Sequence, residues 1–183
     1  AAETECDYLV LSGSLPRGVP PDFYARLVAQ GRRGRRILLD TSGAALRPAL
    51  EGGGIFLVKP SRGELEQFAG KPLADDGALL EAARGIVRSG FAKHVAVTLG
   101  HLGAMLVSAQ GELRLPALEV EVRSAVGAGD SFLGAATFAL ASGETIEQAI
   151  RLGLAAGTAA VMSPGTGLCD PKDIAALLAG VRP

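Results

Sequence analysis

The stretch Arg36–Ala69, RILLDTSGAALRPALEGGGIFLVKPSRGELEQFA, contains the same pattern twice. Each half begins with a short apolar run, first Arg36–Asp40 (RILLD) and then Ile55–Lys59 (IFLVK), and each run leads into a segment with helical character. Short apolar runs bounded by turn residues are typical of buried strands. Strands that alternate with helices indicate an α/β fold with a largely parallel sheet.

The same alternation continues on both sides of this stretch. Asp7–Ser12 (DYLVLS) and His94–Thr98 (HVAVT) predict two further buried strands. One helix is expected to begin at Pro20. Three further helices are expected at Ala44–Glu51, Ser61–Ala69 and Asp76–Ser89. We therefore expect a repeated strand–helix architecture over the first half of the chain.

The second half of the sequence has a different pattern. Three closely spaced runs, Ala104–Ala109, Glu112–Leu115 and Leu118–Val122, predict a small antiparallel meander at one edge of the sheet, with a hairpin turn at Gln110-Gly111. The helices expected after it are Ala128–Ala141, Ile146–Met162 and Lys172–Leu178. Because no linker composition interrupts the chain, we expect residues 1–183 to form a single domain.

Composition excludes several classes of function. Lys and Arg number 18 against 19 Asp and Glu, a net charge of −1, which gives no field for nucleic acid or an anionic membrane. The four arginines of the run Gly31–Arg36 follow a helix and have no interleaved aromatic residues, which favours a solvated turn over a nucleic-acid site. No apolar run approaches the roughly 18 residues that span a bilayer. We expect a cytoplasmic protein without nucleic-acid or membrane partners.

Metal and dinucleotide sites of the common kinds are also disfavoured. The only two histidines, His94 and His101, have no cysteines nearby to complete a zinc site. No Gly-x-Gly-x-x-Gly with a later acidic residue follows the first strand, as a dehydrogenase would require.

The segment Gly127-Ala128-Gly129-Asp130 joins an expected strand to an expected helix. Glycines at a helix start leave backbone N–H groups uncovered where the helix dipole is positive, and such a start binds anions. A carboxylate in the first turn, Asp130, could accept a proton from an attacking hydroxyl. The same Asp could instead only stabilise its own helix.

Three other segments place glycines or charges at strand or helix ends. Thr98–Ala104 (TLGHLGA) follows a buried strand, at the edge where nucleotides bind in open α/β sheets. Gly165-Thr166-Gly167 follows a long helix rich in Ala and Gly, whose small side chains leave room for a flat base, although Gly165 could equally be a helix C-cap. Glu64 lies three residues after Ser61, a spacing that fits a helix capping box as well as a metal or phosphate role.

Taken together, these segments resemble the PfkB-type (ribokinase-like) carbohydrate kinases, and Ser12–Gly18 resembles the phosphofructokinase branch. The resemblance covers nearly the whole chain in the family's order, and implies a three-layer α/β/α fold. Its motifs are Ser12–Gly18, Leu39–Gly43, Lys59-Pro60-Ser61 with Glu64, Thr98-Leu99-Gly100 with Gly103-Ala104, Gly127–Asp130, and Gly165-Thr166 with Leu168-Cys169.

The resemblance also implies roles for individual residues. Asp130 would be the catalytic base, and the amides of Gly127, Ala128 and Gly129 would form the anion hole. Ser14 would contact the phosphate of the sugar. Asp40, Lys59 and Glu64 would organise the nucleotide phosphates and Mg²⁺, Glu64 through water. The nucleotide channel would be lined by Thr98, Gly100, Gly103 and Gly165.

Some relatives in this family hold a monovalent cation, K⁺, between two loops. The residues at the matching positions here are Ser124, Val126, Ala160, Ser163, Gly165 and Gly167, of which Ser163 and Gly167 depart from the family in side chain. Ser61 also departs, because many relatives have Asn there, and a shorter side chain weakens the case for contact with metal-bound water.

The function implied is ATP-dependent transfer of a phosphoryl group to a hydroxyl of a sugar phosphate, a step of carbohydrate metabolism such as glycolysis. Fructose 6-phosphate is the leading acceptor, with fructose 1-phosphate and tagatose 6-phosphate as alternatives. Relatives carry a long additional region before the first strand, with further sugar contacts. We therefore expect this chain alone to be inactive, to act at most as a nucleotide-binding module, and to associate with other copies through the edge of its sheet.

Overall fold

The computed structural model describes residues 5–31, 34–165, 167 and 169–181. The chain consists of two compact units. The first unit contains Ala1–Thr98 and Met105–Glu112, and the second contains Leu99–Ala104 and Leu113–Pro183.

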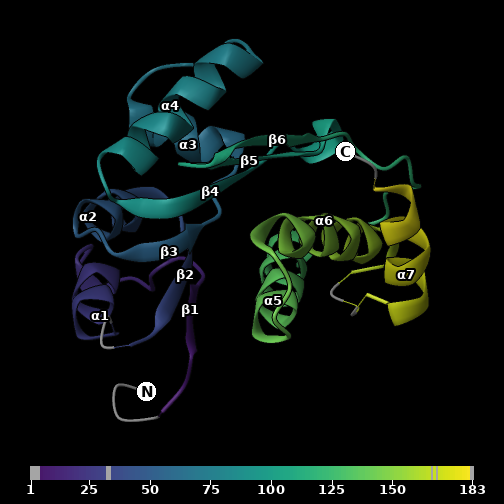
Figure 1. Cartoon of the computed structure of the whole chain (residues 1–183), viewed down its shortest axis with the longest axis horizontal. Helices are drawn as coiled ribbons and strands as arrows, with labels where there is room; N and C mark the ends of the chain where they lie inside the picture. The colour runs from purple at the N-terminus through teal and green to yellow at the C-terminus, as the bar shows by residue number, and fades with distance from the viewer. Residues whose placement is uncertain (1–4, 32–33, 166, 168, 182–183) are drawn as a thin grey trace. The chain divides into compact units, whose positions relative to one another are not determined.

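The first unit is built on parallel strands that lie in chain order. Strands β1 (Tyr8–Ser12), β2 (Arg36–Asp40), β3 (Ile55–Val58) and β4 (Ala92–Thr98) are neighbours in the sheet, and each adjacent pair is parallel. The connections contain helices α1 (Phe23–Gly31), α2 (Leu46–Glu51, after the short 3₁₀ turn Gly43–Ala45), α3 (Arg62–Ala69) and α4 (Asp76–Arg88), as Figure 1 shows. The repeated strand–helix prediction is therefore confirmed.

Close pairing aligns the carboxyl ends of these strands. Ser12 is opposite Asp40 at the ends of β1 and β2, and Val58 of β3 is opposite Leu39 and Val95. An isolated bridge joins Ser61 to Thr98 beyond β3 and β4. The strands meet because their apolar side chains are buried; Ile37, Leu38, Leu39 and Leu57 have no exposed surface. The strand ends thus form one edge at which polar residues gather.

Strands β5 (Ala104–Ser108) and β6 (Gly111–Leu115) complete the six-stranded sheet, which is mixed. Only two residues connect them, and a connection this short joins antiparallel strands. The third strand predicted at Leu118–Val122 is wrong. Pro116 has no N–H to give to a sheet, and Leu118 instead approaches Gly180 at the end of α7 (Pro171–Gly180).

The second unit consists mainly of helices, as the sequence predicts. It contains α5 (Ala128–Ala141), α6 (Ile146–Met162), α7 and the 3₁₀ turn Gly100–Leu102. Helices α5 and α6 approach closely because α6 has glycines where they meet. A Cβ on Gly153 would lie 2.9 Å from the Phe132 carbonyl oxygen, and one on Gly157 would lie 3.0 Å from that of Ala128.

Within the described residues, no helix has both the length and the apolar character that crossing a membrane requires.

Candidate active site

The carboxyl ends of β2 and β3 place a charged pair in the interior of the first unit. Lys59 directly follows β3, and its Nζ lies 3.0 Å from Oδ2 of Asp40, the last residue of β2. The two side chains are only 5% and 16% exposed. Burying a lone charge is costly, so each charge here depends on the other. Since an ammonium group has three donors, Lys59 can hold this carboxylate and still contact a second anion.

The loop after β1 is tied to the same strand end. Gly13 has a φ of 102°, a conformation that suits glycine, and its N–H donates to the Asp40 carbonyl oxygen at 2.9 Å. Its own carbonyl accepts from the hydroxyls of Tyr24 and Thr41. Ser14, the next residue, is exposed. The structure therefore brings the Ser14 loop to the edge that carries Asp40 and Lys59.

Glu64 is used in the way that its spacing from Ser61 suggests. It is the third residue of α3, and its Oε2 accepts from the Ser61 N–H at 2.7 Å, while the Ser61 hydroxyl accepts from the Glu64 N–H at 3.3 Å. This is a complete capping box. A role in binding Mg²⁺, which the resemblance implies, would be a second function of the Glu64 carboxylate.

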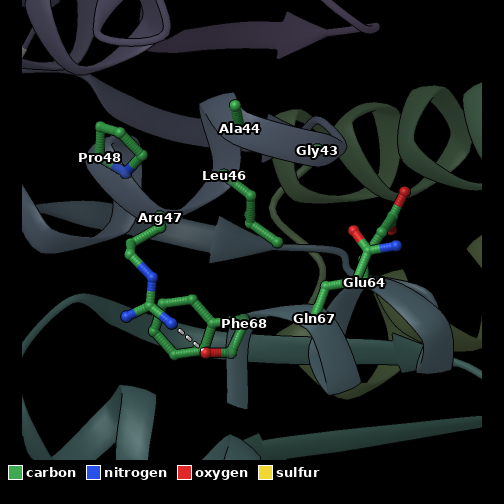
Figure 2. Close-up of a pocket in the computed structure, with 8 residues that line it drawn as sticks. All are labelled: Gly43, Ala44, Leu46, Arg47, Pro48, Glu64, Gln67 and Phe68. Carbon is green, nitrogen blue, oxygen red and sulfur yellow. Dashed lines mark hydrogen bonds between the residues drawn. The ribbon is translucent and has the colours of Figure 1, made fainter. Parts of the chain in front are cut away.

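A cavity of about 250 Å³ lies beside this carboxylate, between the Gly43–Pro48 segment and α3 (Figure 2). At the other side of the cavity, Arg47 lies against Phe68. The guanidinium carbon of Arg47 is 4.8 Å from the centre of the Phe68 ring, and the guanidinium donates a hydrogen bond to the Phe68 carbonyl. Arg47 is thereby committed to Phe68 and to Glu51, 3.3 Å away. Glu64 faces open space that a ligand or water can enter. The lining residues are Gly43, Ala44, Leu46, Arg47, Pro48, Glu64, Gln67 and Phe68.

In the second unit, α5 begins at a glycine in the left-handed conformation. Gly127 has φ 79° and ψ −2°, it has no side chain with which to cap the helix, and a Cβ there would meet nothing within 4 Å. The first N–H groups of a helix have no partner within it, so this open start can receive an anion. Asp130 is exposed at the third helical position, directly beside those amides. Ala128 and Gly129 lie between Gly127 and Asp130 in the sequence, and the Ala128 carbonyl packs closely against Gly157.

The glycines near β4 have two different environments. Gly103 has φ 94° and ψ −134°, and a Cβ there would overlap the Leu115 carbonyl oxygen. Packing against Leu115 therefore already requires glycine at this position. A Cβ on Gly100 would meet nothing within 4 Å. Thr98 ends β4 in the first unit, and its N–H donates to the Pro60 carbonyl at 2.9 Å.

The two loops expected to hold a monovalent cation lie side by side within the second unit. The N–H groups of Arg123 and Ser124 donate to the Val161 carbonyl at 2.7 and 3.1 Å. Ser163 follows α6 as its C-cap and bonds back to Ala160, and the Gly167 N–H donates to the Pro164 carbonyl. Val126 and Gly165 are exposed, and Gly165 has a φ of 63°. Thr166, Leu168, Arg32 and Arg33, which belong to motifs of the sequence, lie outside the described residues.

Two residues near Asp40 have no role in the sequence-based prediction. Thr41 lies inside the motif Leu39–Gly43, and Tyr24 lies in α1, yet both direct hydroxyls at the Gly13 carbonyl. A tyrosine on the buried face of an amphipathic helix was the available signal, since a buried phenol usually has a hydrogen-bond partner. The partner itself depends on tertiary packing.

Comparison with known proteins places these observations in a family. The sequence matches the pfkB family carbohydrate kinases over residues 2–173. It is 42% identical over 166 residues to ATP-dependent 6-phosphofructokinase isozyme 2 of Escherichia coli K12, a match that covers 90% of this chain and 54% of that protein. It is 38% identical over 176 residues to 1-phosphofructokinase of the same strain, covering 96% and 56% respectively.

A solved structure agrees with the fold. The crystal structure of phosphofructokinase-2 from Escherichia coli in complex with potassium superposes with a TM-score of 0.90 at 40% identity, covering 94% of this chain and 56% of that one. The chain spans about half the length of the curated relatives it matches. Both the α/β fold and the expected family are therefore confirmed. This chain belongs to the pfkB family of carbohydrate kinases.

Proposed function

We propose that this chain supplies the ATP-binding and phosphoryl-transfer part of a kinase that acts on a sugar phosphate. The observation that carries the proposal is the start of α5, where the N-cap is a left-handed glycine, Gly127, which has no side chain, and the exposed Asp130 follows in the first turn. Family membership and the two phosphofructokinase relatives support the same activity.

Each group at this helix start has a task in phosphoryl transfer. The amides of Gly127, Ala128 and Gly129 hold the negative charge that develops on the transferred group. Asp130 accepts the proton from the acceptor hydroxyl as that oxygen attacks. Catalysis of this kind depends mainly on positioning and charge, so a helix start that packs closely on Gly157 suits it.

The Asp40–Lys59 pair, together with Glu64, is proposed to serve the nucleotide phosphates and Mg²⁺. The described residues contain no group of three or more His, Cys, Asp or Glu side chains that would cage a metal. Separate carboxylates suit Mg²⁺ nevertheless, because it keeps most of its waters and binds through one or two carboxylates and the substrate phosphates. When bound, Mg²⁺ neutralises phosphate charge, while Lys59 adds an ammonium donor. Thr98, Gly100 and Gly165 are proposed to border the nucleotide; Gly103, which packing already fixes, is proposed to shape that loop.

A K⁺ site is proposed between the loop at Ser124–Val126 and the end of α6. The N–H groups of Arg123 and Ser124 bind the Val161 carbonyl and hold the two loops together. Backbone carbonyls are suitable ligands for such a cation, and the related phosphofructokinase-2 was solved with potassium. The remaining proposed positions are Ala160, Ser163, Gly165 and Gly167.

The acceptor is proposed to be fructose 6-phosphate, with its phosphate near Ser14. The relative with 42% identity, a 6-phosphofructokinase, favours this sugar, and the relative with 38% identity, a 1-phosphofructokinase, favours fructose 1-phosphate as the second candidate. Turnover of each sugar by the protein as its gene encodes it, with ATP and Mg²⁺, decides between them.

The test of the mechanism is Asp130→Asn. We expect turnover to fall by about 10²- to 10⁴-fold, because the general base is lost, while ATP affinity changes no more than a few-fold. Asp173→Asn is a matched control, since Asp173 is also the third residue of a helix, α7. It should lose only the small stabilisation that a carboxylate gives to its own helix.

Equal turnover in the two variants would reduce Asp130 to a helix-stabilising residue and remove the proposed mechanism. A wild-type protein that phosphorylates neither fructose phosphate would remove the proposed acceptor class.

A further inference from the structure

Tyr24 is a buried phenol that the proposed mechanism does not use. It belongs to the first turn of α1 and is 8% exposed. Its hydroxyl lies 3.0 Å from the carbonyl oxygen of Ser12 and 3.0 Å from that of Gly13. The phenol therefore donates at the point where β1 ends and the Ser14 loop begins.

A second buried hydroxyl donates to the same place from another strand end. Thr41, which is 3% exposed, directs Oγ1 at the Gly13 carbonyl oxygen over 2.9 Å. The Gly13 N–H in turn donates to the Asp40 carbonyl. Both sides of Gly13 are thus fixed, its carbonyl by two hydroxyls and its N–H by β2.

Fixing this carbonyl also fixes the next residue. The peptide unit is planar, and no cis peptide bond occurs among the described residues. In a trans peptide the carbonyl and the following N–H point in opposite directions. Because the Gly13 carbonyl points at Tyr24 and Thr41, the Ser14 N–H must point away from these buried hydroxyls.

We propose that Tyr24 and Thr41 are positioning residues for the sugar phosphate. By holding the Gly13 carbonyl, they aim the Ser14 N–H and set the place of its side chain for an anionic group of the acceptor. This inference rests on the proposed function, because it assigns the Ser14 loop to the acceptor. It predicts effects on acceptor binding more than on ATP binding, since both hydroxyls donate to the Gly13 carbonyl, whereas Lys59 pairs with Asp40.

The phenol is suited to this task over the working pH range. Burial, and then the negative charge of Asp40, raise the pKa of Tyr24 above its ordinary value of 10.0. Tyr24 therefore remains a proton donor at any pH at which the enzyme would act.

The experiment compares four variants with the wild-type protein as its gene encodes it. Tyr24→Phe and Thr41→Val each remove one hydroxyl and keep the shape of the side chain. Thr41→Ser restores the hydroxyl. Tyr8→Phe is the matched control, because Tyr8 begins β1 at its far end and its hydroxyl bonds Arg36 instead. The readouts are the KM for fructose 6-phosphate, the KM for ATP, kcat, and deuterium exchange of the peptide that covers residues 13–18.

We expect Tyr24→Phe and Thr41→Val to raise the acceptor KM by about five- to tenfold, the effect of one lost hydrogen bond. The KM for ATP should stay within about twofold, and exchange of residues 13–18 should become faster. Thr41→Ser and Tyr8→Phe should resemble the wild type. If Tyr24→Phe leaves the acceptor KM unchanged in an active enzyme, the positioning role is wrong, whatever the exchange shows. If the wild type phosphorylates no sugar phosphate, the proposed function itself fails, and this inference with it.

Discussion

Lys59 and Asp40 show at the scale of single residues how a site can be charged and buried at once. The ammonium group is 5% exposed and lies 3.0 Å from its carboxylate. Losing either partner would leave an uncompensated charge, which typically costs about 3 to 5 kcal/mol. The pair therefore supports the fold as well as any ligand, and stability must be measured alongside activity whenever either residue is changed.

His94 gives a prediction at the same scale. Within the described part of the chain its buried Nδ1 has no hydrogen-bond partner, and its ring contacts Phe56 edge-on at 4.9 Å. Burial, then Lys93 and Arg36, lower the pKa of His94 below its ordinary value of 6.5. As the pH falls below about 6.5, the unfolded chain binds a proton that the folded chain resists, so stability decreases.

We therefore expect His94→Leu to flatten the dependence of unfolding free energy on pH between about pH 7 and about pH 5. The difference in slope must stay below about 1.4 kcal/mol per pH unit, the limit for one proton. Urea unfolding at several pH values measures it. The only other histidine is His101, which is exposed, so His101→Gln is the control. A slope that His94→Leu leaves unchanged would contradict the lowered pKa.

At the scale of elements, the close contact between α5 and α6 requires glycine in α6, although glycine normally destabilises a helix interior. In most helix interiors, Gly→Ala stabilises by roughly 0.5 to 1 kcal/mol. At Gly153 the new methyl group would lie 2.9 Å from the Phe132 carbonyl and 3.1 Å from its ring. We expect Gly153→Ala to destabilise the protein by about 1 to 3 kcal/mol, because the helices must separate.

Gly134 is the matched position for this test. It also lies inside a helix, α5, but a Cβ there meets nothing within 4 Å, so Gly134→Ala should stabilise. Midpoints of urea unfolding measure both changes. The close-contact explanation fails if the two substitutions shift the midpoint in the same direction.

The sequence predicted the elements whose signals are local. Apolar runs and glycines gave β1 to β6 and α5 to α7 to within a few residues of their observed ends. Leu118–Val122 failed because alternation reports which side chains are buried and not which backbone groups pair: Leu118 and Val120 are half-buried without belonging to a strand.

Prediction of the site was limited in the same way. The spacing of Ser61 and Glu64 predicted a capping box, which the structure contains. The packing of Gly103 against Leu115 and the bond from Tyr24 to Gly13 join residues far apart in sequence. No local pattern encodes such contacts.

At the scale of the whole molecule, the edge of the sheet is the feature with the largest consequence for association. Among the strands that the structure describes, β1 has β2 on one side and ends the sheet order, and Val10 at its centre is 41% exposed. Asp7 and Gly13 direct their backbone groups to β2, so alternation places those of Val10 on the other side. Such an edge recruits another chain.

We expect the 183-residue chain, studied alone, to self-associate through this edge, and to show no sugar kinase activity. Val10→Pro removes one outward N–H without touching the β2 ladder, and it should shift the sedimentation of the chain toward the monomer. Val10→Thr keeps that N–H and separates its effect from loss of apolar surface. A monodisperse wild-type chain that phosphorylates fructose 6-phosphate would contradict both expectations.

The order of the strands has a further consequence, for how the protein is made. The six strands lie in the sheet in the order in which the ribosome produces them, from β1 to β6. Each new strand can therefore pair with the one finished just before it, and no strand must wait for a distant partner still to be synthesised. Chains fold from the N-terminal side during synthesis, and nearby pairings form faster than distant ones. The sheet can thus grow one strand at a time, at the pace of translation.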